Sequence, residues 1–218
     1  MKRSYRQFCA LARALDVVGE RWTLLIVREL LFGPRRYTDL LGGLPGIGTN
    51  LLADRLRQLE QVALVRRTVL PPPAARAYEL TERGRELEPA LVALARWGMS
   101  PMAPPAPQDQ RRPSWYALAL LSAFRPGAAA GLREEYGFRI DAEAFHIRVR
   151  DGEADIRQGE AGAPVFVLEA GLDRFLEIAT GRLAPERVES EGAGRLRGDP
   201  AAARRWLAAF RLPEPAPR

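Results

Sequence analysis

The sequence is poor in three residue types on which protein chemistry often depends. Its 218 residues include one cysteine, Cys9, one histidine, His146, and one lysine, Lys2. A single cysteine excludes an intrachain disulfide and favours a reducing compartment. A lone histidine lacks the second histidine or cysteine that a zinc site needs, so we expect no metal and no bound cofactor.

Long apolar runs and catalytic motifs are also missing. No stretch reaches about 18 uninterrupted apolar residues, so we expect a soluble cytoplasmic protein that does not enter a membrane. The chain has no glycine-rich phosphate loop and no Ser-His-Asp order, and we predict that it is not an enzyme. The pair Glu134-Glu135 is interpreted as a solvated helix face.

Positive charge is concentrated in the first half of the chain. Residues 1–98 contain 16 Lys and Arg against 10 Asp and Glu, a net charge of +6, whereas residues 99–218 contain 17 of each. This asymmetry indicates a polyanion-binding domain beside a domain with another task. Residues 99–113 hold five prolines and no apolar periodicity, as extended linkers do. We predict domains at 1–98 and 114–213, joined by this linker.

The first half has the element order of a helix-turn-helix protein. Helices are expected at 9–18 and 22–32, the second apolar nearly all round and therefore central to the core. A short helix at 37–41 precedes an amphipathic helix at about 49–62. This last helix is expected to bury Leu51, Leu52, Leu56 and Leu59, and to expose Thr49, Asn50, Ala53, Asp54, Arg57 and Gln58.

Residues that follow complete a winged helix. The segment RRTVLPPPAARAYEL predicts a two-stranded ribbon whose loop carries Arg76. Thr81 can cap a helix running to about Trp97, which either closes the core or mediates dimerisation. A polar helix beside a basic ribbon predicts a DNA-binding domain.

The second half predicts an α+β domain with an antiparallel sheet. Helices are expected at 114–124 and 130–138, followed by a hairpin in which Phe145, Ile147 and Val149 alternate with polar residues up to Asp151-Gly152. His146 is placed on the polar side of that strand. A strand at 164–170, a helix, a further strand and a final helix PAAARRWLAAF complete the domain.

Residues 8–98 resemble the HxlR-type winged-helix transcriptional regulators, which are relatives of the MarR type. The shared features are GxRWTLLIxRELLxGPRRYxxL, LxxRLRxLE and YELTxxG. The resemblance implies a dimeric DNA-binding repressor or activator that is governed by a small molecule or by redox chemistry. Members commonly carry Ser at the position of Gly48 and a basic residue at that of Asn50, so their operator preference does not transfer.

Residues 114–212 more loosely resemble sterol carrier protein type 2-like domains. The resemblance rests on a strand and helix ending in TGRLAPE, and on a strand ending in RGDP before a last helix. It implies a sheet backed by helices around an apolar pocket, and thus a hydrophobic small-molecule effector. The open alternatives are a hydrophobic-ligand carrier whose winged helix is a protein interaction module, and a second domain that only extends the dimer interface.

Seven residues are expected to contact double-stranded operator DNA. Thr49 and Asn50 open the exposed helix and are assigned to base edges, because an Asn amide can pair bidentately with adenine. The residues assigned to the sugar-phosphate backbone or the minor groove are Arg36, Tyr37, Thr38, Arg57 and Arg76. Arg57 could instead pair with Asp54 or Glu60. Cys9 is expected to be either a redox sensor or a small buried residue.

Overall fold

The computed structural model describes residues 4–71, 74–99, 105–106 and 108–214. The chain divides into two compact units, a first unit of residues 1–91 and a second unit of residues 92–218. Much of the expected linker, residues 100–104 and 107, lies outside the described residues. No helix in the described parts is long and apolar enough to cross a membrane.

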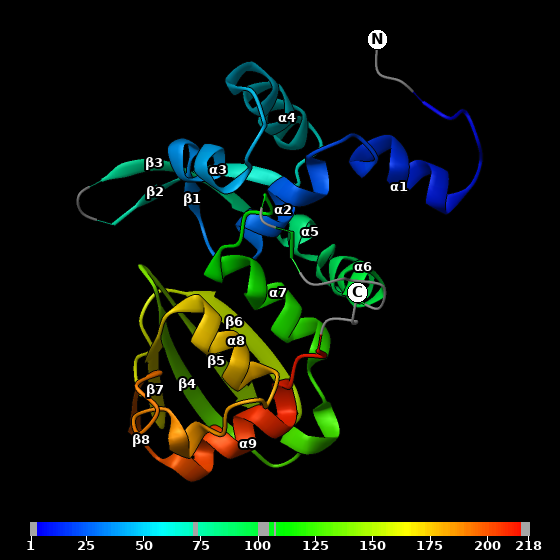
Figure 1. The fold of residues 1–218 in the computed structure, drawn as a ribbon. Coiled ribbons are helices and arrows are strands. Elements are labelled where there is room, and N and C mark those ends of the chain that lie inside the picture. The colour runs from blue at the N-terminus through cyan, green and yellow to red at the C-terminus, as the bar shows by residue number, and fades with distance from the viewer. Residues whose placement is uncertain (1–3, 72–73, 100–104, 107, 215–218) are drawn as a thin grey trace. The chain divides into compact units, whose positions relative to one another are not determined.

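The first unit has the predicted helix-turn-helix and ribbon (Figure 1). Its elements are α1 (Ala10–Val18), α2 (Thr23–Leu31), β1 (Arg35–Arg36), α3 (Tyr37–Gly43), α4 (Thr49–Gln61), β2 (Val65–Leu70), β3 (Ala75–Leu80) and α5 (Glu82–Arg85). The helix α6 (Glu88–Met99) begins in the first unit and ends in the second. The strand order is β1-β3-β2, so the predicted two-stranded ribbon gains a third strand that sequence analysis missed.

One apolar stripe fixes α4 in the first unit. Leu52, Leu56 and Leu59 are at most 2% exposed, and α2 contributes the equally buried Ile26 and Val27 to the same core. Residues four and three positions apart lie on one face of a helix, which explains this set. The prediction for Leu51 was wrong: its side chain is 37% exposed, because it lies about 100° around the helix from Leu52.

The single helix expected from Thr81 to Trp97 is two helices, α5 and α6. The predicted cap is confirmed, since the Thr81 hydroxyl accepts a hydrogen bond from the Gly84 N–H at 3.1 Å. Pro89 explains the interruption, because it has no N–H to donate to the carbonyl of Arg85. Leu91 is buried on α6, whereas Leu94 and Trp97 are exposed.

The base of the ribbon depends on a close approach at Gly84. The backbone oxygen of Leu64 accepts from the Thr81 N–H at 3.0 Å, and the Thr81 hydroxyl donates to the Ala63 carbonyl at 2.6 Å. A Cβ atom at Gly84 would lie 2.1 Å from the Leu64 oxygen. The glycine of the YELTxxG motif is therefore the residue that lets α5 approach the start of β2.

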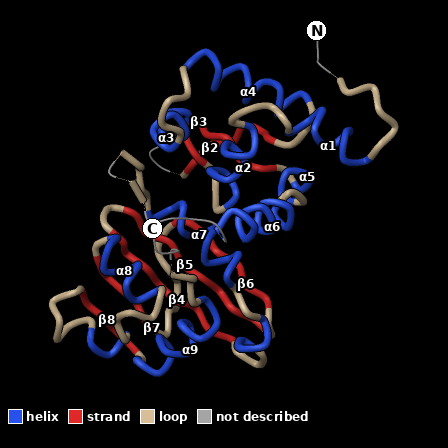
Figure 2. The backbone as a smooth tube through the Cα atoms, turned by 45° about the vertical axis from the view of Figure 1, so that its right-hand side comes forward, coloured by secondary structure: helices blue, strands red, loops and turns tan. Residues whose placement is uncertain are grey.

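The second unit is a five-stranded sheet with helices on one face (Figures 1 and 2). Its strand order is β6-β5-β4-β7-β8, and the β4–β7 pair is parallel while the other pairs are antiparallel. The elements are α7 (Pro113–Ala123), η1 (Pro126–Ala129), β4 (Arg133–Ile140), β5 (Glu143–Arg150), β6 (Glu153–Gln158), β7 (Phe166–Ala170), α8 (Leu172–Ala179), η2 (Pro185–Arg187), β8 (Gly194–Gly198) and α9 (Pro200–Phe210). The α+β content was predicted, but the expectation of a wholly antiparallel sheet was wrong, because β4 and β7 run parallel.

The helix expected at 130–138 was wrong, because most of these residues belong to β4 in the middle of the sheet. Tyr136, Phe138 and Ile140 are fully or almost fully buried at every second position, which is the periodicity of a strand. The preceding Leu-Arg-Glu-Glu run favours a helix by intrinsic propensity, and burial between two neighbouring strands overrides that preference. The Asp151-Gly152 hairpin is confirmed, with φ values of 51° and 85°.

Aromatic rings fill the space between the sheet and its helices. Phe138 lies at the centre of this cluster, and its ring centroid is 4.8 Å from that of Phe145, 5.7 Å from that of Phe166 and 5.1 Å from that of Trp206. Phe175 of α8 packs edge-on against Phe138 at 6.0 Å. The aromatic residues that could line an apolar pocket therefore contact one another.

Replacing Gly84 by alanine should destabilise the protein by about 2 kcal/mol or more, because the new methyl group would overlap the Leu64 carbonyl oxygen. The free energy of unfolding can be measured by urea denaturation. Gly48→Ala is the matched control: nothing lies within 4 Å of a Cβ atom at Gly48, and its effect should stay below about 1 kcal/mol. Equal effects of the two substitutions would contradict the packing role of Gly84.

Candidate nucleic-acid interface

The first turns of α4 present a row of polar side chains to solvent. Thr49, Asn50, Asp54, Arg57 and Gln58 are all exposed, as the sequence predicted, whereas Ala53 is half-buried. The helix begins after Gly48, which has no side chain with which to cap it. Asn50 is thus near the start of the helix, where side chains can reach base edges in a major groove.

Tyr37 connects the two helices of the helix-turn-helix. Its hydroxyl donates a hydrogen bond to the backbone carbonyl of Thr49 at 2.7 Å, which joins the first residue of α3 to the first residue of α4. The phosphate contact expected of Tyr37 stays a prediction, and nothing in the sequence indicated this bond. The half-buried tyrosine fixes the position from which Thr49 and Asn50 leave the domain.

The start of α3 already binds a carboxylate of the protein itself, that of Asp39. The Arg36 N–H donates to a carboxylate oxygen of Asp39 at 3.1 Å, so this N–H cannot serve the phosphate contact expected there. A carboxylate in the first turn also satisfies the positive end of the helix dipole. The side chains of Arg36 and Thr38 remain exposed, which leaves the side-chain contacts proposed for them available.

Arg76 lies within β3 and not in the ribbon loop, which corrects its predicted place. It is the second residue of the strand, in register with Val69 of β2, and both side chains are exposed. The loop residues 72–73 are outside the described part of the chain. In the same sheet Arg36 is in register with Ala77, the residue after Arg76, so the ladder places these two arginines on neighbouring strands.

The arginines of α4, β1 and the ribbon differ in whether they form an ion pair with an Asp or Glu side chain. Arg57 pairs with Asp54, as the alternative interpretation allowed. Arg66 pairs with Glu79 at 2.8 Å and Arg67 with Glu60 at 2.8 Å, and the hydrogen bond to Glu60 raises the pKa of Arg67. Within the described residues, no carboxylate lies within ion-pair distance of the Arg36 or Arg76 guanidinium.

Cys9 is exposed and directly precedes the first residue of α1, so the interpretation of it as a small buried residue was wrong. Its neighbours are also unusual, because Phe8 is fully exposed and Leu11 is 67% exposed. These apolar side chains face solvent where the chain enters α1. Exposed apolar side chains that lie together are typical of interaction surfaces.

His146, Glu134 and Glu135 of the second unit are engaged in hydrogen bonds within the protein. His146 is buried, and its Nδ1 lies 3.1 Å from the carbonyl oxygen of Gly159. The prediction of a solvated helix face at Glu134 and Glu135 was wrong, since both belong to β4 and each side chain is 14% exposed. In the described parts of the chain, no group of three or more His, Cys, Asp or Glu side chains could hold a metal ion.

Comparison with known proteins connects the first unit to one family. Residues 17–105 match the family model described as HxlR-like helix-turn-helix. An uncharacterised HTH-type transcriptional regulator of Synechocystis is 42% identical over 92 residues, which are 41% of this chain and 67% of that protein. The HTH-type transcriptional regulator YodB of Bacillus subtilis is 38% identical over 85 residues, which are 38% of this chain and 76% of YodB.

A longer relative occurs in Mycobacterium tuberculosis. This uncharacterised HTH-type transcriptional regulator is 48% identical over 90 residues, 41% of this chain. The chain spans 56% of the length of that protein. The sequence similarity to all three relatives therefore concerns less than half of the chain.

Tyr37→Phe should lower the free energy of unfolding by about 1 kcal/mol, because the Thr49 carbonyl loses its hydrogen-bond donor. Urea denaturation followed by circular dichroism measures the loss. Tyr78→Phe is the control, because no hydrogen bond through the Tyr78 hydroxyl occurs within the described residues of this half-buried side chain. If both variants are as stable as the wild type, the bond does not hold α3 and α4 together.

Proposed function

The chain belongs to the HxlR-like helix-turn-helix family, and we propose that it regulates transcription by binding a specific double-stranded DNA operator. The relatives are HTH-type transcriptional regulators, which supports DNA binding as the activity of the first unit. The observation that carries the proposal is the polar first turn of α4 beside a ribbon with exposed arginines. The alternative of a ligand carrier is not favoured.

The proposed DNA contacts divide into two kinds. Asn50 and Thr49 reach base edges, since they open the exposed helix and their side chains have no competing charge partner in the described residues. Arg36, Thr38 and Arg76 contact the sugar-phosphate backbone or the minor groove. Arg57 contributes less, because DNA phosphate must compete with Asp54 for its guanidinium. Tyr37 acts by holding Thr49 in place.

A homodimer would present two such helices to the two halves of an operator. The exposed apolar side chains near α1 are the surface that we propose to be covered in it: Tyr5, Phe8, Leu11 and Leu15. Half-sites would then be separated by about one helical turn of DNA, roughly 34 Å, or a multiple of it. Cys9 lies within this apolar segment with its thiol exposed, which keeps it as our proposed redox site.

We propose that the second unit is the regulatory part of the protein. This proposal is supported by the sheet with α7, α8 and α9 on one face, which is the arrangement that the looser resemblance to sterol carrier protein type 2-like domains implies. A hydrophobic effector between sheet and helices would have to separate rings that now touch, such as Phe138 and Trp206. Such a ligand would control DNA binding only if its affinity differs between DNA-bound and free protein.

Asn50→Ala should cost about 1–3 kcal/mol of discrimination between operator and unrelated DNA, because a base contact is lost. Arg76→Ala should weaken both kinds of DNA alike and reduce the salt slope by about one unit, because a phosphate contact is lost. Fluorescence anisotropy titrations at several salt concentrations separate the two effects, with an operator obtained by genomic footprinting of the purified protein.

Arg83→Ala is the matched control for these titrations. Arg83 is an exposed arginine of α5, at the base of the ribbon and near the C-terminal end of α4. Its removal changes the net charge as Arg76→Ala does, but should leave affinity and salt slope close to wild type. Loss of affinity by the same factor in Arg76→Ala and Arg83→Ala would show that net charge, and not this interface, governs binding.

Leu11→Glu should convert a dimer into a monomer, because it places a charge in the proposed apolar interface while changing a side chain that is 67% exposed. Sedimentation velocity would show the mass fall by about half. Val69→Glu, at a 65% exposed position on the ribbon, is the control and should leave the mass unchanged. A wild-type monomer, or a Leu11→Glu variant that stays dimeric, would refute this interface.

A further inference from the structure

The sheet of the second unit carries a partial cover on the face away from its helices. Residues 159–165 cross this face over Gly137, whose Cβ would lie 3.4 Å from the Cβ of Ala161 and 3.1 Å from Val167. Glycine at this position therefore lets the segment lie flat on the strand. The Val165 N–H donates to the Glu135 carbonyl at 2.8 Å, and the segment then continues into β7.

Glu135 anchors that covering segment. Its carboxylate accepts hydrogen bonds from the N–H groups of Gly162 and Ala163, at 3.1 and 3.3 Å, and from Arg148 at 3.3 Å. Burial raises the pKa of Glu135, but these hydrogen bonds outweigh it and hold the pKa below its usual value. His146 adds a second anchor through Gly159. The wall formed by the segment is thus fixed to the sheet at two places.

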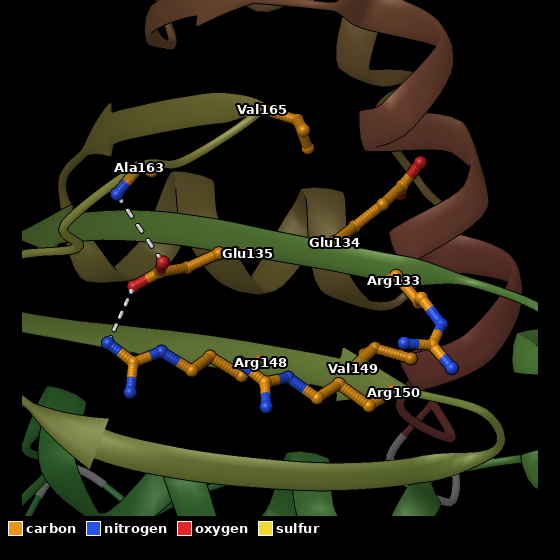
Figure 3. A pocket seen from close by; sticks show the side chains of 8 residues that line it. All are labelled: Arg133, Glu134, Glu135, Arg148, Val149, Arg150, Ala163 and Val165. Atoms are coloured by element: carbon orange, nitrogen blue, oxygen red, sulfur yellow. Dashed lines mark hydrogen bonds and ion pairs between the residues drawn. The ribbon is translucent and has the colours of Figure 1, made fainter.

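Next to this wall is a pocket of about 460 Å³, where β4 begins and β5 ends (Figure 3). It is lined by Arg133, Glu134, Glu135, Arg148, Val149, Arg150, Ala163 and Val165. Figure 3 shows the Arg148 and Arg150 side chains running in the same direction along β5, with Glu135 between Arg148 and Ala163. The volume is in the range that holds a small organic molecule.

The two acids of the pocket are satisfied by groups of the protein itself. Glu134 accepts from Arg205 at 2.6 Å through one oxygen and from the Tyr136 hydroxyl at 2.8 Å through the other. Glu135 is engaged by the covering segment and by Arg148. Neither carboxylate therefore needs a cation from solution.

The arginines, in contrast, keep donors to spare. Arg150 is exposed and in register with Glu153 of β6, yet no ion pair joins them within the described residues. Arg148 uses a single nitrogen toward Glu135, while a guanidinium has five N–H donors. Arg133 pairs with Asp151 at 2.7 Å, but both side chains are more than half exposed, which makes that pair weak.

We propose that this pocket binds a small organic anion, whose carboxylate or phosphate group accepts hydrogen bonds from Arg148 and Arg150. Planar guanidinium groups bind both kinds of oxyanion through charge-assisted hydrogen bonds. Ala163 and Val165 form the wall for the apolar part of the ligand. The site goes beyond the proposed DNA-binding function, because all of its residues belong to the second unit and its occupation can be measured without DNA.

Isothermal titration calorimetry of the full-length protein with benzoate, phenyl phosphate and benzamide tests the site. Benzoate or phenyl phosphate should bind and neutral benzamide should not, and the better anion identifies the preferred oxyanion. Arg150→Gln should weaken that anion by about tenfold, since it removes charge-assisted hydrogen bonds. In ¹⁵N NMR spectra the binding anion should shift the amide signals of Ala163 and Val165.

Arg195→Gln is the matched control, because Arg195 is an exposed arginine on β8 that does not line the pocket. It should leave the affinity unchanged. The proposal is overturned if neither anion binds, if benzamide binds as well as benzoate, or if Arg150→Gln retains wild-type affinity. It is equally overturned if Arg195→Gln weakens binding as much as Arg150→Gln, which would indicate a general attraction of anions to the surface.

Discussion

The burial of one leucine stripe on α4 is the constraint on which the candidate DNA interface depends. Leu52, Leu56 and Leu59 can all reach the core only in one rotation of the helix, and that rotation turns Asn50 and Arg57 outward. The hydrogen bond from Tyr37 to the Thr49 carbonyl then fixes the start of the helix. Gly84 and Thr81 do the same for the base of the ribbon. Core packing and a few hydrogen bonds thus determine which polar side chains are exposed and available to contact DNA.

Intramolecular ion pairing divides the basic residues of the first unit into two groups. Arg66 and Arg67 are held by Glu79 and Glu60 across strands or between strand and helix, whereas Arg36 and Arg76 have no such acid in the described residues. Such exposed pairs are individually weak, so they do not remove an arginine from a DNA surface. They do lower the free energy that the arginine contributes on binding phosphate, because its ion pair with the acid must first be broken. We therefore expect Arg36 and Arg76 to contribute most to the proposed interface.

The second unit uses the two faces of one sheet for different purposes. Toward the helices, Phe138, Phe166 and Trp206 pack ring against ring and supply its stability. Away from the helices, charged residues alternate along the strands, and Glu135 holds the segment that covers part of this face. An organic effector fits the second face more readily than the first, because entry there requires no separation of packed rings. We therefore place the proposed regulatory ligand on the charged face of the sheet.

The sequence by itself determined the elements whose signals are local. The periodicity of α4, the cap at Thr81 and the Asp151-Gly152 turn each depend on residues within a few positions of one another, and all are present in the structure. The family, in contrast, was indicated by the resemblance of motifs in residues 8–98, and the family match confirms it. The tertiary structure decided everything that depends on distant partners. The strand β4 was mistaken for a helix because only β5 and β7 on either side of it override its local propensity. The roles of Tyr37 and Glu135 likewise depend on Thr49 and on residues 162–163, because a hydrogen bond between residues far apart leaves no periodic trace in a sequence.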